Sequence, residues 1–262
     1  MAKDFFWYEL LTSDRPAAER FYSAVVGWTL QPFGSADDPY TIVEAGKRGV
    51  GGLMTIPPEA REHGLKPCWV GYIHVDDIDA AVDGVRAAGG AVHREPQMIP
   101  TVGRFAVAAD PQGTMFNMLQ PEGMDMPPVP MGTIGGIDWH ELHSSDWEQG
   151  FDFYASQFGW SKTDALDMGA MGSYQMFAME PAPEGATCGV TRGGMMNDAQ
   201  APQPYWLFYF HVDDIDAAIA RVKDNGGTVL FGPQEVPGGV WIINALDPQG
   251  ALFALAGSRE GQ

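Results

Sequence analysis

The chain has 262 residues, and its 15 Lys and Arg residues against 34 Asp and Glu residues give a formal net charge of −19. A surface this acidic repels nucleic-acid phosphates and anionic lipid headgroups, which disfavours nucleic-acid and membrane partners. The apolar fraction of 45% predicts a folded globular protein rather than a disordered chain.

The first predicted elements follow the order β-α-β-β-β. An aromatic and apolar run over residues 5–11 predicts a strand. A helix is expected to begin after Asp14, with Pro16 in its first turn, and to end at Gly27, because glycine readily takes the left-handed conformation. Three short strands are then expected near residues 28–33, 40–45 and 50–56.

The same order of elements follows a second time. A strand is expected over residues 69–75, a helix capped by Asp76 and Asp77 comes next, and the turn DPQG at 110–113 joins the last two strands. The proline-rich stretch 121–136 predicts a linker between a first domain, 1–120, and a second domain, 137–262.

The chain also contains a long internal repeat. YIHVDDIDAAVDGVRAAGGAV at 72–92 matches YFHVDDIDAAIARVKDNGGTV at 209–229, and DPQGTMFNMLQ at 110–120 matches DPQGALFALAG at 247–257. FYSAVVGW at 21–28 matches FYASQFGW at 153–160. A unit of roughly 130 residues is therefore present twice, and each copy holds two β-α-β-β-β modules.

The compartment is predicted from what the sequence contains at its start and from its cysteines. The first residues lack the basic flank and apolar core of a secretory signal, and no apolar run is long enough to span a membrane. Cys68 and Cys188 are expected to be buried free thiols in a reducing environment. We therefore expect a cytoplasmic protein; the sequence indicates no oligomeric state.

Four such modules, with the HVDDIDAA helix, the DPQG hairpin and the paired FY…GW motif, resemble the vicinal oxygen chelate (VOC) superfamily. This superfamily includes glyoxalase I, extradiol dioxygenases and bleomycin- and fosfomycin-resistance proteins. Within it, the stretch IPTVGRFAVAADPQG at 99–113 is similar to a tandem glyoxalase-like group of actinobacterial antigen and hydroxylase proteins. The resemblance implies an α+β fold of two tandem VOC domains. In each, paired modules would form a cupped, incompletely closed barrel with the ligand in the cup.

The resemblance also implies a divalent metal held by His, Glu or Gln at fixed register positions. Counted from the helix-capping and hairpin Asp residues, those positions hold Trp7, Trp139, Val70, Leu207, Asn117 and Ala254. The remaining ligand strands, near 50–55 and 188–192, carry no carboxylate. Indole and alkyl groups offer no lone pair to a metal, so the sequence predicts neither a metal nor another cofactor.

Strand alternation places every second residue on the expected ligand face. That face carries Glu9 in the first half, and Glu141 with His143 in the second. A carboxylate that faces an indole-lined interior loses hydration, which makes it a candidate general acid or base, although it could instead be satisfied structurally. The predicted catalytic residues are Glu141, His143 and, with less weight because Leu11 replaces the histidine, Glu9. The predicted ligand-binding residues are Trp7, Trp139, Tyr72, Tyr209, Asn117, Val70 and Leu207.

Three classes of function remain open at this point. The first is a metal-independent lyase or isomerase of glyoxalase type, in which Glu141 and His143 act on a small carbonyl-bearing or aromatic molecule. The second is a non-catalytic protein that binds and sequesters such a ligand, as the resistance proteins of the superfamily do. The third is a metal-dependent glyoxalase or dioxygenase. The fold alone does not choose among them, because one scaffold hosts many chemistries. In each case the expected partner is a small-molecule ligand.

Overall fold

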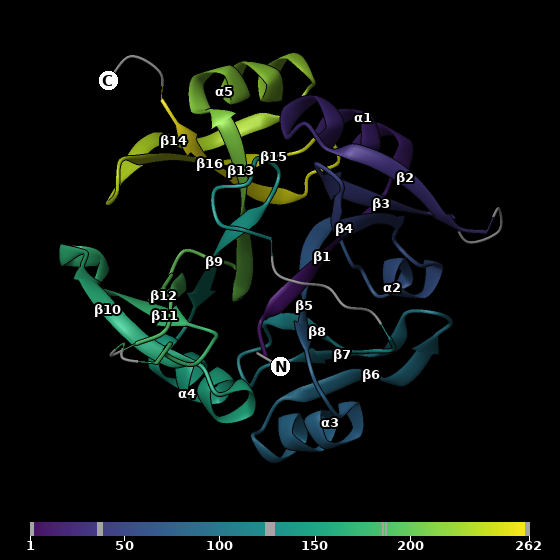
Figure 1. Cartoon of the computed structure of the whole chain (residues 1–262), viewed down its shortest axis with the longest axis vertical. Helices are drawn as coiled ribbons and strands as arrows, with labels where there is room; N and C mark the ends of the chain where they lie inside the picture. The colour runs from purple at the N-terminus through teal and green to yellow at the C-terminus, as the bar shows by residue number, and fades with distance from the viewer. Residues whose placement is uncertain (1–2, 36–38, 124–128, 185, 187, 260–262) are drawn as a thin grey trace. The chain divides into compact units, whose positions relative to one another are not determined.

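A computed structural model describes residues 3–35, 39–123, 129–184, 186 and 188–259 of the chain (Figure 1). The expected module is present four times. The first two modules comprise β1 (Phe5–Thr12), α1 (Arg15–Val25), β2 (Thr29–Gly34), β3 (Pro39–Ala45) and β4 (Arg48–Thr55), and then β5 (Cys68–His74), α3 (Ile78–Ala87), β6 (Ala91–Ile99), β7 (Gly103–Ala109) and β8 (Met115–Pro121). A short helix, α2 (Pro58–Glu62), lies between them and was not expected from the sequence.

The second half repeats this order. Its modules comprise β9 (Ile137–Ser144), α4 (Trp147–Phe158), β10 (Ser161–Asp167), β11 (Ser173–Ala178) and β12 (Thr191–Asn197), and then β13 (Tyr205–Asp214), α5 (Ile215–Asp224), β14 (Thr228–Val236), β15 (Val240–Leu246) and β16 (Leu252–Ser258). A single 3-10 turn, Gly169–Met171, separates β10 from β11.

The strands form two eight-stranded mixed sheets, ordered β2-β3-β4-β1-β5-β8-β7-β6 and β10-β11-β12-β9-β13-β16-β15-β14. In each module the first strand pairs in parallel with the last, as β1 does with β4 and β9 with β12, and the other pairs within a module are antiparallel. Over the described residues neither strand order closes into a ring, which agrees with the expected α+β fold of incompletely closed sheets.

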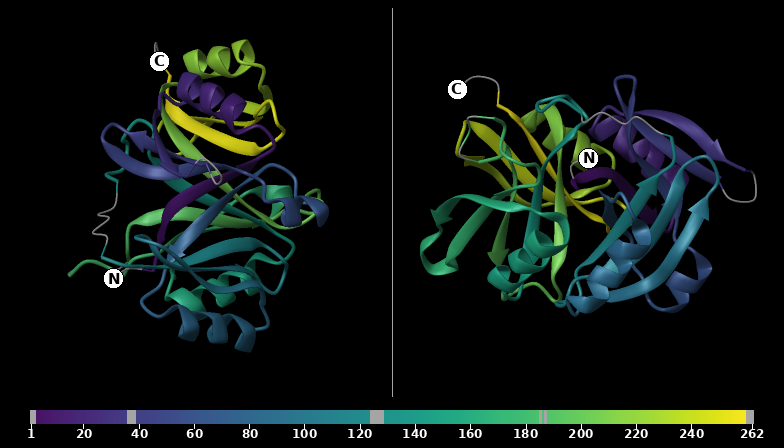
Figure 2. Two further views of the ribbon diagram at one scale, coloured as in Figure 1. Left: turned by 90° about the vertical axis from the view of Figure 1, so that its right-hand side faces the viewer. Right: turned by 60° about the horizontal axis from the view of Figure 1, so that its bottom comes forward.

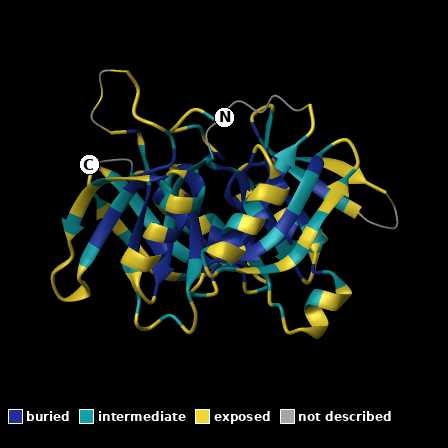
Figure 3. Cartoon of the chain, turned by 90° about the horizontal axis from the view of Figure 1, so that it is seen from below, coloured by how far each residue is buried: buried dark blue, intermediate teal, exposed yellow. Residues whose placement is uncertain are grey.

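Each long helix begins at an aspartate, as the sequence predicts. The side chains of Asp14, Asp77, Asp146 and Asp214 accept hydrogen bonds from backbone N–H groups in the first turn of α1, α3, α4 and α5. An aspartate at this position satisfies donors that the helix itself leaves without partners. Figure 3 shows buried residues along the strands and exposed residues on the outward helix faces and in the loops.

By density of contacts, the chain divides into two compact units. Unit 1 contains residues 1–6, 70–127 and 139–206, and unit 2 contains residues 7–69, 128–138 and 207–262. Unit 1 thus contains most of the second and third modules, and its helices α3 and α4 pack on each other (Figures 1 and 2). Unit 2 contains most of the first and fourth modules, with α1 packed on α5.

The repeated FY and DPQG motifs meet inside these units. In unit 2, Trp69 Nε1 donates to Tyr22 Oη over 2.9 Å, and Tyr22 Oη lies 3.2 Å from Asp247 Oδ2 in the second DPQG turn. In unit 1, an equivalent chain joins Trp206, Tyr154 and Asp110, with distances of 2.9 Å and 3.3 Å. The tyrosine of each FY motif is therefore hydrogen-bonded to the aspartate of the DPQG turn from the other half.

Two expectations about the loops need comment. The predicted linker, 121–136, includes residues 124–128, which lie outside the described residues; beyond them, Gly135 accepts a 2.7 Å hydrogen bond from Trp28 Nε1. Both cysteines are free, but the expectation that both are buried was wrong, because Cys188 is exposed and Cys68 is half-buried. Cys188 lies before β12 begins, in a connection rather than in a strand. No described helix is long and apolar enough to cross a membrane.

Candidate functional site

The strands β11, β12 and β9 are neighbours in the second sheet (Figure 1), and a cluster of polar side chains lies on and beside them in unit 1. β9 and β12 are parallel, with Glu141 paired to Gly194 and His143 paired to Met196. Residues paired across a ladder point to the same face, and alternate residues of one strand share that face. Glu141 and His143 therefore project together, as the strand alternation in the sequence predicted.

Two consecutive glycines on β12 make room for this cluster. A Cβ at Gly193 would collide with the backbone oxygen of His140, so the two parallel strands approach closely there. A Cβ at Gly194 would collide with the ring of Tyr174, which lies across this glycine from β11. Glycine is needed at both positions because only a residue without a side chain permits such close contact.

Glu141 is held first by a tyrosine. Trp139 Nε1 donates to Tyr174 Oη over 2.8 Å, and Tyr174 Oη donates to Glu141 Oε2 over 2.8 Å. Tyr174 is 8% exposed, and burial together with the charge of Glu141 raises the pKa of its hydroxyl well above the ordinary value. The hydroxyl therefore remains protonated and available as a donor to the carboxylate.

His143 lies between two carboxylates. Its Nε2 is 2.8 Å from Glu141 Oε1, and its Nδ1 is 2.9 Å from Asp198 Oδ2. Both contacts are hydrogen bonds at the same time only when two protons are shared among the three groups, as in an imidazolium between two carboxylates. Tyr205 stacks on the imidazole, with ring centroids 4.5 Å apart and planes 7° from parallel.

The charges around His143 favour its protonated form. Burial by itself lowers the pKa of His143, but the hydrogen bonds and charges of Glu141 and Asp198 outweigh burial and raise the pKa above its ordinary value of 6.5. For Asp198, burial acts to raise the pKa, but the hydrogen bond from His143 and those from the backbone of Gln200 and Ala201 outweigh it, so that the pKa is lowered. The Glu141 and His143 side chains are only 12% and 10% exposed, so solvent screens their interaction weakly.

The other histidine of β9 faces the opposite side of the strand, because successive residues of a strand point to opposite faces. His140 Nδ1 contacts the backbone oxygen of Arg192 at 2.8 Å, and its ring stacks on Phe5 with centroids 5.2 Å apart. Burial lowers the pKa of His140 to about 4. His140 is therefore a neutral core residue with no place in the cluster.

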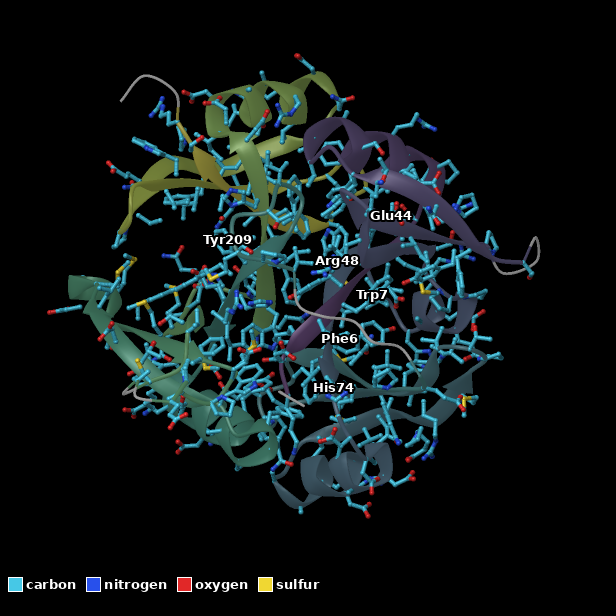
Figure 4. The ribbon with its side chains drawn as sticks, viewed as in Figure 1. Phe6, Trp7, Glu44, Arg48, His74 and Tyr209 are labelled. Carbon is cyan, nitrogen blue, oxygen red and sulfur yellow. The ribbon has the colours of Figure 1, made fainter. Side chains whose placement is uncertain are left out.

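The first half contains the same tyrosine relay without the histidine. In unit 2, Trp7 (Figure 4) donates through Nε1 to Tyr40 Oη, and Tyr40 Oη donates to Glu9 Oε1, each over 3.0 Å. Gly52 pairs with Glu9, and a Cβ there would collide with Tyr40 as one at Gly194 would with Tyr174. Glu9 is 8% exposed.

The positions of His143 and Asp198 are apolar in that half. Leu11 pairs with Met54 as His143 pairs with Met196. The backbone N–H of Ile56 bonds to Thr12 as that of Asp198 bonds to Ser144. The arrangement of a histidine between two carboxylates is therefore specific to the second half.

The other predicted ligand-binding residues lie on the following strands. On β5 and β8 of unit 1, Tyr72 pairs with Asn117, while Val70 lies two residues before Tyr72. On β13 of unit 2, Tyr209 pairs with Ala254, and Leu207 lies two residues before Tyr209. All are buried, with exposures between 1% and 6%: Val70, Tyr72, Asn117, Leu207 and Tyr209.

Sequence reasoning missed three members of these networks, Tyr40, Tyr174 and Asp198. The tyrosines had a duplicated signal, since each half has a tyrosine in its third strand and a glycine pair in its fourth. Asp198 had no such signal, because it follows β12 in a loop and its counterpart in the first half is Ile56.

The comparison with protein families agrees with this architecture. The model of the Glyoxalase/Bleomycin resistance protein/Dioxygenase superfamily matches residues 5–118 and again residues 136–255. These two matches cover most of the chain in two tandem segments. The chain belongs to this superfamily.

Curated relatives match nearly the whole chain. "Putative glyoxylase CFP32" of Mycobacterium tuberculosis (strain CDC 1551 / Oshkosh) is 29% identical over 251 residues, which are 95% of this chain and 92% of that protein. "Anthracycline biosynthesis protein DnrV" of Streptomyces peucetius is 30% identical over 269 residues, with 97% of this chain and 93% of that protein covered.

Solved structures share the fold. The Mn(II)-bound glyoxalase from Novosphingobium aromaticivorans has a TM-score of 0.66 at 18% identity and covers 99% of this chain and 83% of its own. The 2,2',3-trihydroxybiphenyl 1,2-dioxygenase of Sphingomonas wittichii strain RW1 has a TM-score of 0.68 at 13% identity and covers 98% and 91%.

The chain's own residues do not fit a metal site of the kind that these names and the superfamily imply. The ligand register positions carry indole and alkyl groups, with the buried amide of Asn117 as the one oxygen donor among them. His143 is not a ready ligand either, because both of its ring nitrogens are hydrogen-bonded to carboxylates. Within the described residues, no group of three or more His, Cys, Asp and Glu side chains is placed to hold a metal ion.

Proposed function

We propose that this superfamily member is an enzyme that moves a proton on a small carbonyl-bearing aromatic molecule, with Glu141 as the base and His143 as its proton partner. One observation carries the proposal: the second half holds a histidine hydrogen-bonded to two carboxylates, where the first half has Leu11 and Ile56. The hydrogen bonds of the glutamate to tyrosine are the same in both halves, so the histidine and its second carboxylate are additions of the second half, which supports a chemical task there.

The hydrogen bonds suit Glu141 to the role of base. Its Oε2 accepts from Tyr174 and its Oε1 accepts from the His143 side, as expected of an ionised carboxylate. In the proposed step, the carboxylate removes a proton from carbon next to the substrate carbonyl, and the electron pair of the broken C–H bond moves to the carbonyl oxygen. Return of the proton to another carbon completes an isomerisation, or loss of a leaving group completes an elimination, and neither needs an oxidant.

His143 and Asp198 act on the charge of the base. His143 Nε2 already donates to Glu141 Oε1, so the proton taken from the substrate stays on the Glu141 carboxyl group, and Asp198 stabilises the positive imidazole from its other side. Such an orienting third group is the usual partner of an acid–base pair. The positive charge of His143 also offsets negative charge that develops on the substrate oxygen.

The surrounding side chains favour an aromatic substrate. Trp139 and Tyr205 are half-buried beside the cluster, and Met196 and Met176 share its face through their register with His143 and Gly194. Aromatic rings and thioethers suit flat, polarisable ligands. The names of two proteins similar to this chain, one for anthracycline biosynthesis and one for a trihydroxybiphenyl dioxygenase, also refer to aromatic compounds.

The proposal is tested by comparing Glu141→Gln with Glu9→Gln. Exchange of the α-hydrogens of a panel of aryl ketones and α-ketoaldehydes with deuterated water, followed by NMR, detects proton abstraction whatever product is formed afterwards. We expect Glu141→Gln to lose roughly two to four orders of magnitude in rate and Glu9→Gln to lose much less. Binding of the same compounds is followed by tryptophan fluorescence. Binding without exchange in the wild-type protein, or full activity in Glu141→Gln, contradicts the acid–base function, and the first outcome favours a sequestering protein.

A further inference from the structure

The relay from tryptophan to tyrosine to glutamate occurs twice in the chain. Trp139, Tyr174 and Glu141 form it in unit 1, with both distances 2.8 Å, and Trp7, Tyr40 and Glu9 form it in unit 2, with both distances 3.0 Å. The second instance has Leu11 at the position of the histidine. The relay therefore serves the glutamate itself and does not depend on the presence of His143.

Each relay requires a glycine at one position. Gly194 pairs with Glu141 and Gly52 pairs with Glu9, and at both sites the tyrosine ring occupies the space that a Cβ would need. The ring can cross to the glutamate of the next strand only because this space is open. Both halves have the glycine as well as the tyrosine, because the tyrosine ring fits only where the neighbouring strand has no side chain.

The chemistry of the three groups fixes the direction of the hydrogen bonds. An indole N–H can only donate, so the Tyr174 oxygen accepts from Trp139 and directs its single proton to Glu141. Burial raises the pKa of the Tyr174 hydroxyl, so its proton remains available to Glu141. Trp139 thus determines where the hydroxyl proton of Tyr174 points.

We propose that Tyr174 is a positioning residue for Glu141: its hydroxyl, oriented by Trp139, holds Oε2 and leaves Oε1 to form the bond with His143. The catalytic consequence rests on the function proposed above, whereas the positioning itself is a property of the free protein. The Tyr174 hydroxyl donates a hydrogen bond to Glu141 and so stabilises the negative charge of the carboxylate. Glu141 is then a weaker acceptor for the Nε2 proton of His143.

The titration of His143 measures this effect directly. The ionisable groups that face its imidazole are Glu141 on β9, Asp198 after β12 and Tyr205 on β13, with Tyr174 on β11 acting through Glu141. Tyr174→Phe keeps the ring over Gly194 and removes only the hydroxyl. Glu141 then becomes a stronger acceptor, and the midpoint of the His143 titration should rise by roughly 0.5–1 pH unit.

The experiment is an NMR titration of the histidine ring resonances in ¹⁵N-labelled protein, with the His143 signal assigned by its loss in His143→Gln. Tyr40→Phe is the matched control, because it removes the equivalent hydroxyl from the first half and should leave the His143 midpoint unchanged. Gly194→Ala should displace the Tyr174 ring and shift the midpoint in the same direction as Tyr174→Phe, while Gly52→Ala should not. A Tyr174→Phe midpoint equal to that of the Tyr40→Phe control overturns the proposal.

The outcomes separate this proposal from the proposed function. If the His143 midpoint moves as expected but no compound exchanges its α-hydrogens, the relay is supported and the enzymatic role is not. If Glu141→Gln abolishes exchange while Tyr174→Phe leaves the titration unchanged, the enzymatic role stands and the relay fails. With an active substrate, Tyr174→Phe should lower kcat by roughly tenfold at unchanged KM, because it misplaces the base without removing binding contacts.

Discussion

Leu11 and His143 occupy equivalent places in the two halves of the chain, the first paired with Met54 on β4 and the second with Met196 on β12. Two further positions differ in the same sense. Ile56 corresponds to Asp198, and Cys68 begins the strand that Tyr205 begins in the other half. The first half therefore has apolar or neutral side chains at all three of these positions. At the third of them, burial and the nearby Glu9 raise the pKa of the Cys68 thiol to about 11, so the thiol stays neutral.

This pattern assigns different tasks to the two copies. The tryptophan, tyrosine, glutamate and glycine of the relay are kept in both, so a carboxylate is held in the same way twice. Only the second copy adds groups that exchange protons near neutral pH, since an ordinary histidine titrates there and leucine does not. Acid–base chemistry is accordingly expected in the second half alone.

Removal of one carboxylate should lower the pKa of His143. In Asp198→Asn the amide oxygen can still accept from Nδ1, but the negative charge is lost, and we expect a decrease of about one pH unit. The change is read from the histidine ring resonances during a pH titration. Asp213→Asn is the control, because it removes a charge that pairs with Arg221 in unit 2. Equal midpoints for the two variants would show that Asp198 does not stabilise the imidazolium.

The raised pKa of His143 also predicts the sign of a stability effect. The folded pKa lies above the unfolded value of 6.5, so this interaction stabilises the fold fully below pH 6.5 and is lost as pH rises through the folded pKa. The free energy of unfolding, measured with urea, should therefore differ between wild type and His143→Gln more at pH 6 than at pH 9. A difference that grows with pH would contradict the assignment.

His140 should produce the opposite dependence. The folded protein keeps this imidazole neutral down to about pH 4, whereas the unfolded chain protonates it near pH 6.5. Acidification across this window thus favours unfolding by up to about 3 kcal/mol, and stability rises again as pH increases from 4 to 6.5. The measurement is urea unfolding at pH 4.5 and pH 6.5.

Asp4 modifies that result in a predictable way. Burial raises its pKa to about 6, so protonation of Asp4 stabilises the fold at low pH and this contribution is lost as pH rises toward 6 and above. The two groups oppose each other in wild type and give a shallow dependence. The His140→Gln variant loses the contribution of His140 and keeps that of Asp4. Its free energy of unfolding should therefore fall as pH increases from 4.5 to 6.5. A variant that still gains stability over this interval would show that His140 is not the group responsible.

The buried tyrosines of α1 and α4 should each contribute to stability through one hydroxyl. Tyr22→Phe leaves Trp69 Nε1 and Asp247 without that partner, and Tyr154→Phe does the same for Trp206 and Asp110. Loss of a buried bridging hydroxyl costs about 1–3 kcal/mol, and we expect this decrease in the free energy of unfolding for each variant. The double variant should show the sum, because the two networks share no residue. Variants as stable as wild type would mean that water replaces the hydroxyl.

Much of the fold could be predicted from sequence because its signals are local and repeated. The capping aspartates Asp14 and Asp77 and the DPQG turn each act over a few residues, and the repeat of roughly 130 residues supplies such signals in both halves. The placement of Glu141 and His143 on one face follows from the two-residue period of a strand. These features do not depend on contacts between distant parts of the chain.

The partners of Glu141 and His143 could not be derived in this way. Tyr174 reaches Glu141 from 33 residues away, and Asp198 reaches His143 from 55 residues away. These contacts depend on the order β11-β12-β9 and on the glycines that bring the strands close. The same applies to the pairing of Tyr22 with Asp247, which crosses from one half of the sequence to the other. Strand alternation predicts which face of the sheet a side chain occupies, but it does not predict which side chains of other strands contact it.

The purified protein should contain much less than one equivalent of manganese, iron, zinc or nickel after dialysis against a chelator. The reason is the donor set: a stable site needs three or more imidazole, carboxylate or thiolate ligands, and the register positions of the superfamily carry Trp7, Val70, Trp139, Leu207 and Ala254 with a single amide, Asn117. Recruitment of His143 would break a hydrogen bond to Glu141 or Asp198, at a cost to the fold.

Elemental analysis gives the metal content, and thermal unfolding with and without added manganese gives an independent measure, because a metal that binds the folded state raises Tm. We expect an unchanged Tm in millimolar manganese. Near-stoichiometric metal that survives the chelator, or a Tm that rises with metal in wild type but not in His143→Gln, would favour the metal-dependent reaction over the acid–base one.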